Sequence, residues 1–217
     1  MIQSTRLWLL DRSIDLRHAW LAVRRRLGAP RLLVAVLVAA GLWQVGTGLY
    51  LHAKAWLAQA LIEQAWQHNR EQGRASARPW AWADTIAVAR ITFVEHSRSM
   101  VVLEGDAGRV LAFGPGHRSG TVLPGGAGNS VVSGHRDTHF RILEQVSAGQ
   151  RIEVERLDGR SRTYRVSGAR IVEARDLGVV ADRGRDELTL VTCWPFDAVA
   201  PGGPLRYVVS ALAEDRP

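Results

Sequence analysis

Cysteine and lysine are almost absent from this chain of 217 residues. Cys193 is the only cysteine, which excludes a disulfide bond within the chain. Lys54 is the only lysine, so arginine carries nearly all of the basic charge. This skew is typical of a GC-rich coding sequence and indicates no particular chemistry.

Acidic residues are scarce at the N-terminus, and this explains most of the net charge of +7. Residues 1–31 hold seven arginines and two aspartates, which leaves only +2 for the rest of the chain. A protein that binds nucleic acid carries its basic stripe on the folded domain. The charge therefore argues against a nucleic-acid partner and indicates a basic cytoplasmic tail over residues 1–31.

Charged residues are missing altogether from residues 32–51. A helix of about 20 apolar residues spans a bilayer, and arginines before such a span keep that side in the cytoplasm. We predict a single-pass transmembrane helix that anchors the rest of the chain on the far side of the inner membrane, in the periplasm. A cleaved signal peptide, ending at Ala53-Lys54-Ala55, is the alternative, but its apolar core would be about 7–15 residues long. A buried core helix would normally carry a polar stripe.

Beyond the span, the pattern changes from helical to β. Residues 52–83 are predicted to form a juxtamembrane helical stalk and linker, and residues 84–217 a separate domain. Alternating and β-branched runs predict about eight short strands with few helices, which is typical of a closed β-barrel or a sandwich. These runs are Thr85–Phe93, Ser99–Leu103, Asn129–Ser133, Arg151–Glu155, Thr163–Val166, Ala169–Glu173, Glu187–Thr192 and Leu205–Leu212.

Two kinds of cofactor site find little support. The glycine-dense segment 113–134 lacks the Gly-Lys-Ser/Thr ending of a phosphate-binding loop, so it more simply supplies turns. His135, Asp137 and His139 could hold a metal, but no further cluster supplies ligands. We expect neither a metal nor another cofactor.

Cys193 is the strongest candidate for chemistry because it ends a buried strand and faces a basic residue. Arg206 begins the next strand after the Pro201–Pro204 turn, so the two residues are expected at facing strand ends. A thiol beside a guanidinium tends to ionise, and the thiolate is the nucleophile. The alternative is a small buried hydrophobe, which is common for a free cysteine.

A cysteine nucleophile needs an acid or base within reach. Three histidines remain once those in the tail, the stalk and a hairpin turn are set aside: His117, His135 and His139. His135 follows a strand directly and is therefore placed like Cys193, at the edge of the sheet. His117 lies in a glycine-rich loop, where capping a turn is an alternative role, and for His139 the alternative is packing or a hydrogen bond to the backbone.

Three motifs stand in a fixed order: Val132-Ser133-Gly134-His135-Arg136-Asp137-Thr138, Thr189-Leu190-Val191-Thr192-Cys193, and Arg206 thirteen residues after the cysteine. Together they resemble the sortase family. The GPGH…LPG…GHRDTHF run, the Cys-Trp-Pro-Phe ending and the arginine-rich composition resemble most the sortases of Gram-negative bacteria. The resemblance covers about residues 84–212 and implies a mainly β fold, an eight-stranded sortase-like barrel with short helices after the N-terminal transmembrane helix.

The resemblance also implies roles and partners. Cys193 would attack a C-terminal LPxTG-like sorting signal of a substrate protein and form a thioacyl intermediate, which an amine acceptor then captures. His135 would transfer protons, Arg206 would hold the substrate carbonyl or stabilise the oxyanion, and Thr192 would line the peptide groove. No acidic cluster matches the calcium site of Gram-positive relatives, so no metal is implied.

Other classes stay open at this point. An L,D-transpeptidase carries its arginine two residues after the cysteine, where this chain has Pro195. A hydrolytic cysteine enzyme would share the acyl chemistry, and a non-catalytic anchored β-domain would not need Cys193. Thiol reactivity at neutral pH separates the enzymes from the last of these.

Overall fold

The computed structural model describes residues 4–200 and 202–214. Residues 1–3, 201 and 215–217, which include the ends of the predicted tail and of the predicted domain, lie outside it. The chain divides into two compact units, Met1–Lys54 and Ala55–Pro217. Helix α1 (Ser4–Glu71) supplies all described residues of the first unit and the start of the second.

Part of α1 has the properties of a membrane span. Within the described residues, Pro30–Glu71 is the one stretch of helix long and apolar enough to cross a membrane, and its most apolar window is not buried by protein. Its exposed side chains include Leu33, Leu37 and Leu49. This agrees with the predicted apolar helix over residues 32–51.

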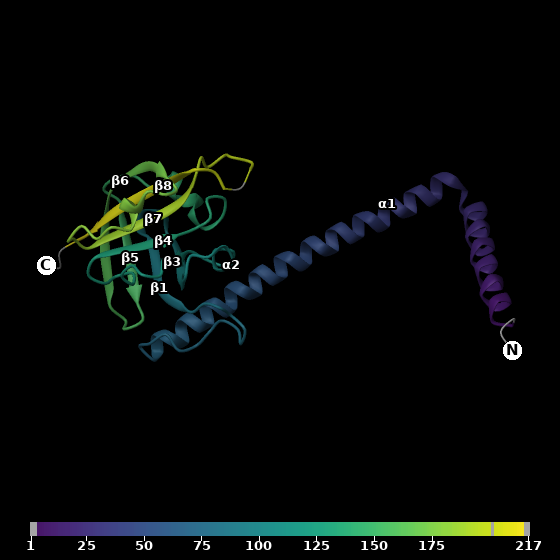
Figure 1. The fold of residues 1–217 in the computed structure, drawn as a ribbon, viewed down its shortest axis with the longest axis horizontal. Helices are drawn as coiled ribbons and strands as arrows, with labels where there is room; N and C mark the ends of the chain where they lie inside the picture. The colour runs from purple at the N-terminus through teal and green to yellow at the C-terminus, as the bar shows by residue number, and fades with distance from the viewer. Residues whose placement is uncertain (1–3, 201, 215–217) are drawn as a thin grey trace. The chain divides into compact units, whose positions relative to one another are not determined.

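The second unit is built on a closed barrel of eight strands, so the predicted mainly β class is confirmed (Figure 1). The order around the barrel is β1-β2-β3-β4-β7-β8-β6-β5, with β2/β3 and β4/β7 parallel and the other pairs antiparallel. The strands are β1 (Ala87–Phe93), β2 (Arg98–Glu104), β3 (Gly116–His117), β4 (Asn129–Ser133), β5 (Arg151–Arg156), β6 (Ser161–Glu173), β7 (Glu187–Trp194) and β8 (Leu205–Ala213). The short helices are η1 (Val94–His96), α2 (Gly108–Leu111), η2 (His139–Glu144) and η3 (Leu177–Val179).

The predicted strands differ from the observed ones in two places: one strand was predicted as two, and one short strand was missed. The number of strands is therefore still eight. Thr163–Val166 and Ala169–Glu173 form the single strand β6, because the pairing with β8 shifts at Gly168 without breaking. A bulge of this kind bends a strand and keeps it in the sheet. The prediction of a glycine-rich loop at His117 was also wrong, because Gly116 and His117 form β3 between β2 and β4.

The core of the barrel follows the alternation of its strands. Along β1, alternate residues are buried, which places Ile91 and Phe93 inside. Leu190 of β7 and Val209 of β8 meet them in the same buried cluster. Side chains fill this interior. The cavity that Cys193 lines lies where strands end.

The last turns of α1 pack against the barrel within the second unit. Ile62 and Trp66 lie in one buried cluster with Ala87, Val101 and Leu103, and Trp66 has no exposed surface. The side chain of Asn69 accepts hydrogen bonds from the backbone N–H groups of Ser76 and Ala77, so it fixes the chain that leaves the helix.

Candidate active site

The parallel pairing of β4 with β7 brings His135 and Cys193 to one end of the barrel. Ser133 is the register partner of Val191, so the residues two positions later are His135 and Cys193. The Gly134 N–H donates to the Val191 carbonyl at 3.0 Å. His135 therefore follows the end of β4, and Cys193 lies near the end of β7, at the same end of the barrel.

Gly134 is required by the packing at this point. A Cβ built on it would lie 2.6 Å from the ring of Phe140, which is fully buried. A clash of this size with a packed ring cannot be relieved by a small shift. The glycine thus lets the segment that carries His135 pass close over the barrel core.

Cys193 and Arg206 are register partners across the antiparallel pair β7/β8. Both side chains are half-buried. Arg206 Nη1 donates to the carbonyls of Gly203 (2.8 Å) and Leu205 (2.9 Å), which holds the guanidinium at the strand end. The sequence-based expectation that these two residues face each other on neighbouring strands is confirmed.

An aromatic cluster supports the strand end that bears Cys193. Trp194 stacks on Tyr207 with ring centroids 5.6 Å apart, and Phe196 meets both rings edge-on. Such contacts add rigidity beyond simple burial. Trp194 and Phe196 flank the proline that ends the strand, so the cluster fixes the chain just after the thiol.

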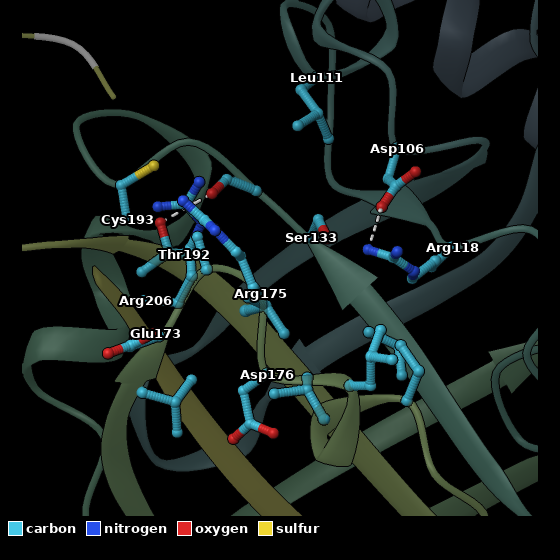
Figure 2. Close-up of a pocket in the computed structure, with 18 of the residues that line it drawn as sticks. Asp106, Leu111, Arg118, Ser133, Glu173, Arg175, Asp176, Thr192, Cys193 and Arg206 are labelled. Carbon is cyan, nitrogen blue, oxygen red and sulfur yellow. Dashed lines mark hydrogen bonds and ion pairs between the residues drawn. The ribbon is translucent and has the colours of Figure 1, made fainter. Parts of the chain in front are cut away.

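A cavity of about 320 Å³ opens beside these residues and is of the size that small ligands or peptide side chains occupy. His135, Thr192, Cys193 and Arg206 all line it. In the view of Figure 2, Cys193, Thr192 and Arg206 lie on one side and the Asp106–Arg118 ion pair on the other, with Arg175 between. Its other walls come from the ends of β4, β6 and β7 and from residues 174–180.

Thr192 contributes to this cavity in a way that the sequence did not reveal. Its side chain is buried, and the hydroxyl donates to the carbonyl of Gly134 at 2.7 Å. The hydroxyl is therefore engaged in joining β7 to the segment after β4.

The other two candidate histidines are placed differently. His117 is buried, with Nδ1 2.9 Å from the Glu104 carboxylate and Nε2 3.0 Å from the Val122 carbonyl. It is absent from the cavity lining. His139 begins η2 and is half-buried. Burial and the positive charges of His135 and Arg98 lower the pKa of His139, while Asp137 opposes this shift.

Several cavity residues were not singled out by sequence reasoning. Arg175, Asp176 and Leu177 belong to the connection between β6 and β7 that forms one wall. Their only sequence signal is position, because they precede the strand that ends in Cys193. Among the residues that the structure describes, no group of three or more His, Cys, Asp or Glu side chains could hold a metal ion.

Comparison with known proteins identifies the class that this barrel and site define. The family model for the sortase domain matches residues 91–214. This match covers more than half of the chain, and the chain belongs to the sortase family.

Individual relatives agree with this assignment. Sortase D of Bacillus subtilis (strain 168) is 32% identical over 109 residues, which are 50% of this chain and 54% of the relative. The chain thus spans about half the length of this curated relative. The crystal structure of sortase C-1 from Actinomyces oris is 30% identical with a TM-score of 0.53, over 59% of this chain and 72% of that one. The Clostridium perfringens Sortase D5 transpeptidase has a TM-score of 0.58 over 72% of this chain and 99% of its own, and at 22% identity it shows the shared fold.

Proposed function

We propose that this chain is a membrane-anchored cysteine transpeptidase that cleaves an LPxTG-like sorting signal and transfers the acyl part to an amine. The observation that carries the proposal is the meeting of three groups at one cavity. Cys193 and Arg206 face each other across β7 and β8, and His135 leaves the parallel strand β4 at the same end. Membership of the sortase family supports the same reaction class.

The first step is an acyl transfer to sulfur. The Cys193 thiolate attacks the threonine carbonyl carbon, forms a C–S bond, and the C–N bond to the following glycine breaks. His135 gives a proton to the departing amine. The products are a thioester on Cys193 and the glycine-side peptide.

The second step reverses this chemistry with a new partner. An incoming amine attacks the thioester carbon and gives its proton to His135, while the C–S bond breaks and restores the thiolate. A thioester divides one difficult acyl transfer into two easier ones. Water in place of the amine would give the hydrolytic alternative.

Arg206 and Thr192 support both steps. Nη2 and Nε of Arg206 remain for the substrate oxygen, since the two carbonyls at the strand end occupy Nη1. A positioned donor is most valuable where negative charge develops in a site that excludes water. Thr192 lines the peptide groove through its place in the cavity wall.

The organisation of the chain follows from the same proposal. Residues 1–31 form a cytoplasmic tail, 32–51 the single inner-membrane span, 52–83 the stalk and linker, and 84–217 the catalytic domain in the periplasm. The arginines before the span support this orientation. A phosphatase reporter that needs the periplasm should be active when fused after Pro217, and activity only as a cytoplasmic reporter would reverse the topology.

The bacterial group to which the enzyme belongs is a separate proposal. The GHRDTHF and Cys-Trp-Pro-Phe runs resemble sortases of Gram-negative bacteria. The relatives described above are Gram-positive sortases and do not support this narrower assignment.

The test uses the full chain in detergent micelles with an LPxTG-type peptide. Mass spectrometry should find the acyl portion on Cys193 together with the released glycine-side fragment. An amino-terminal glycine peptide or hydroxylamine should speed turnover and redirect the product from acid to amide. Cleavage without that redirection would identify a hydrolase.

The matched control is Cys193→Ala, which should abolish the adduct and leave the melting curve nearly unchanged. If Cys193→Ala still cleaves the peptide, or if no peptide of this class acylates the unaltered chain, the proposed function fails.

A further inference from the structure

The arginine that follows His135 is buried and binds the loop that follows Cys193. Only 7% of the surface of Arg136 is exposed. Its Nη2 donates to the carbonyls of Ala198 at 2.8 Å and Ala200 at 2.6 Å. Both acceptors lie in the connection between β7 and β8, more than sixty residues further along the chain.

A second arginine from the same segment holds the same loop. Arg141 lies in η2, and its Nη1 donates to the Phe196 carbonyl at 2.9 Å. Three alternate carbonyls, those of residues 196, 198 and 200, are thus bound from the segment that starts at His135. The loop they belong to has Cys193 before it and Arg206 after it.

Stability alone explains the burial of Arg136 poorly. A guanidinium is always charged in proteins, and a buried charge costs free energy unless an opposite charge compensates it. Among the described residues, no carboxylate forms an ion pair with Arg136, and its Nη1 is buried without a hydrogen-bond partner. A neutral side chain of similar length would fill the same space at lower cost.

The guanidinium of Arg136 fixes the position of the loop carbonyls that it binds. Its planar group lets one nitrogen bind two carbonyls in a fixed direction, which the single ammonium of lysine does less well. Arg136 directly follows His135, and the two carbonyls that it binds lie five and seven positions after Cys193. A loop held at these points cannot move away from the His135 segment without breaking both bonds.

We propose that Arg136 is a positioning residue that sets the approach of His135 to Cys193, by holding residues 196–200 against the His135 segment. The proposal rests on the proposed function, because it assigns the spacing of that enzyme's acid–base and nucleophile. The proposal adds Arg136 to the residues that support catalysis, through its hydrogen bonds to the loop and not through the Cys193 sulfur or the His135 imidazole.

Two variants of the full chain in detergent micelles test this, with one matched control. Arg136→Met removes the charge and keeps the length, whereas Arg136→Lys keeps the charge and can reach one carbonyl. Arg156→Met is the control, because Arg156 Nη1 donates to the carbonyl of Gly125, in a loop that does not line the cavity.

Three measurements are made on each variant: two without any peptide substrate, and the kinetics of cleavage of the LPxTG-type peptide. Hydrogen exchange reports the opening of the amides of residues 196–200. The rate of Cys193 alkylation by iodoacetamide, followed from pH 5 to 10, reports how the thiol senses its neighbours.

We expect Arg136→Met to speed exchange in the loop by about tenfold or more, to shift the alkylation–pH curve and to lower kcat for peptide cleavage more than it raises KM. Arg136→Lys should lie between Arg136→Met and the unaltered chain. Arg156→Met should match the unaltered chain in all three measurements.

The proposal is overturned if loop exchange is unchanged in Arg136→Met. It is also overturned if exchange speeds up while the alkylation curve and kcat stay as in the unaltered chain, since Arg136 then only stabilises a loop. Should Arg136→Met lose its melting transition, Arg136→Lys decides by the same criteria. Failure of the unaltered chain to form a thioacyl adduct would instead sink the proposed function, and the alkylation and exchange results would still stand.

Discussion

The Thr192 hydroxyl donates a 2.7 Å hydrogen bond to the carbonyl of Gly134, directly between the residues proposed as nucleophile and proton carrier. Thr192 precedes Cys193, and Gly134 precedes His135. The bond therefore joins the segments that carry these two residues, across a separation of 58 positions in the chain. Its donor side chain is 2% exposed, so water competes little with it.

Thr192→Val should reduce both stability and turnover, because it keeps the shape and leaves the Gly134 carbonyl without its donor. An unsatisfied buried polar group costs about 1–3 kcal/mol. Thermal unfolding and peptide cleavage measure the two effects. Thr192→Ser, which keeps the hydroxyl, is the control and should recover most of the turnover; equal losses in both variants would show that the methyl group matters and the bond does not.

Arg206→Lys should lose most of the activity and keep the fold. Lysine preserves the charge but not the fork of donors, in which Nη1 binds two strand-end carbonyls and Nε and Nη2 remain for the proposed substrate oxygen. Loss of one such donor costs about a hundredfold or more in kcat. Arg165→Lys, at an exposed ion pair with Glu214 on the barrel, is the control. Near-normal kcat in Arg206→Lys would place Arg206 outside the catalytic machinery.

Alanine at each of the three histidines should separate their roles. His135→Ala should lower kcat by about a hundredfold to ten-thousandfold, the usual contribution of a general acid–base group. His117→Ala should instead lower the melting temperature, because it opens a buried space and removes the contacts of the ring with Glu104 and the Val122 carbonyl. A loss at His139 as large as that at His135 would mean that the base is misassigned or that His139 orients it.

Glu187 should make the stability of the barrel depend on acid pH. Its side chain is fully buried, and burial alone would raise its pKa. A hydrogen bond from Ser210 and the charges of Arg183 and Arg185 outweigh burial, so the pKa lies below its ordinary value of 4.5. A group with a lowered pKa in the folded state stabilises that state above its unfolded pKa, and this contribution disappears as the pH falls through the folded pKa.

Glu187→Gln should therefore melt earlier than the unaltered chain at neutral pH, and the gap should narrow as the pH falls below about 4.5. Melting curves from pH 7 to pH 3 provide the measurement. Glu153→Gln, at an exposed position of β5, controls for the loss of one negative charge. A gap that stays constant with pH would show that the carboxylate is not what stabilises this end of β7.

Local patterns were enough to predict most of the barrel and the pair Cys193 and Arg206. Alternation marks strands such as β1 and β5, and a strand–turn–strand pattern places the two residues opposite each other. β3 was missed because its two residues, Gly116 and His117, are too few to show an alternation of apolar and polar side chains. The two halves of β6 were predicted as separate strands because a bulge at Gly168 interrupts the alternation as a turn would.

Contacts between distant segments account for the rest. Nothing near Arg136 in the sequence indicates that it binds carbonyls of Ala198 and Ala200. In the same way, the i, i+4 pattern of residues 55–71 predicts a helix but not the surface that covers Trp66. These contacts depend on the closure of the barrel, which single-sequence reasoning does not reach.

The packing of Trp66 has a consequence for cleavage of the chain between the proposed membrane span and the barrel. A protease that cuts the polar segment between Gly73 and Pro79 would separate the barrel from a helix whose Ile62 and Trp66 cover Ala87, Val101 and Leu103. The released piece would expose that apolar surface and tend to aggregate. In the proposed topology, release of an intact barrel therefore requires a cut before the packed turns of α1 that carry Ile62 and Trp66.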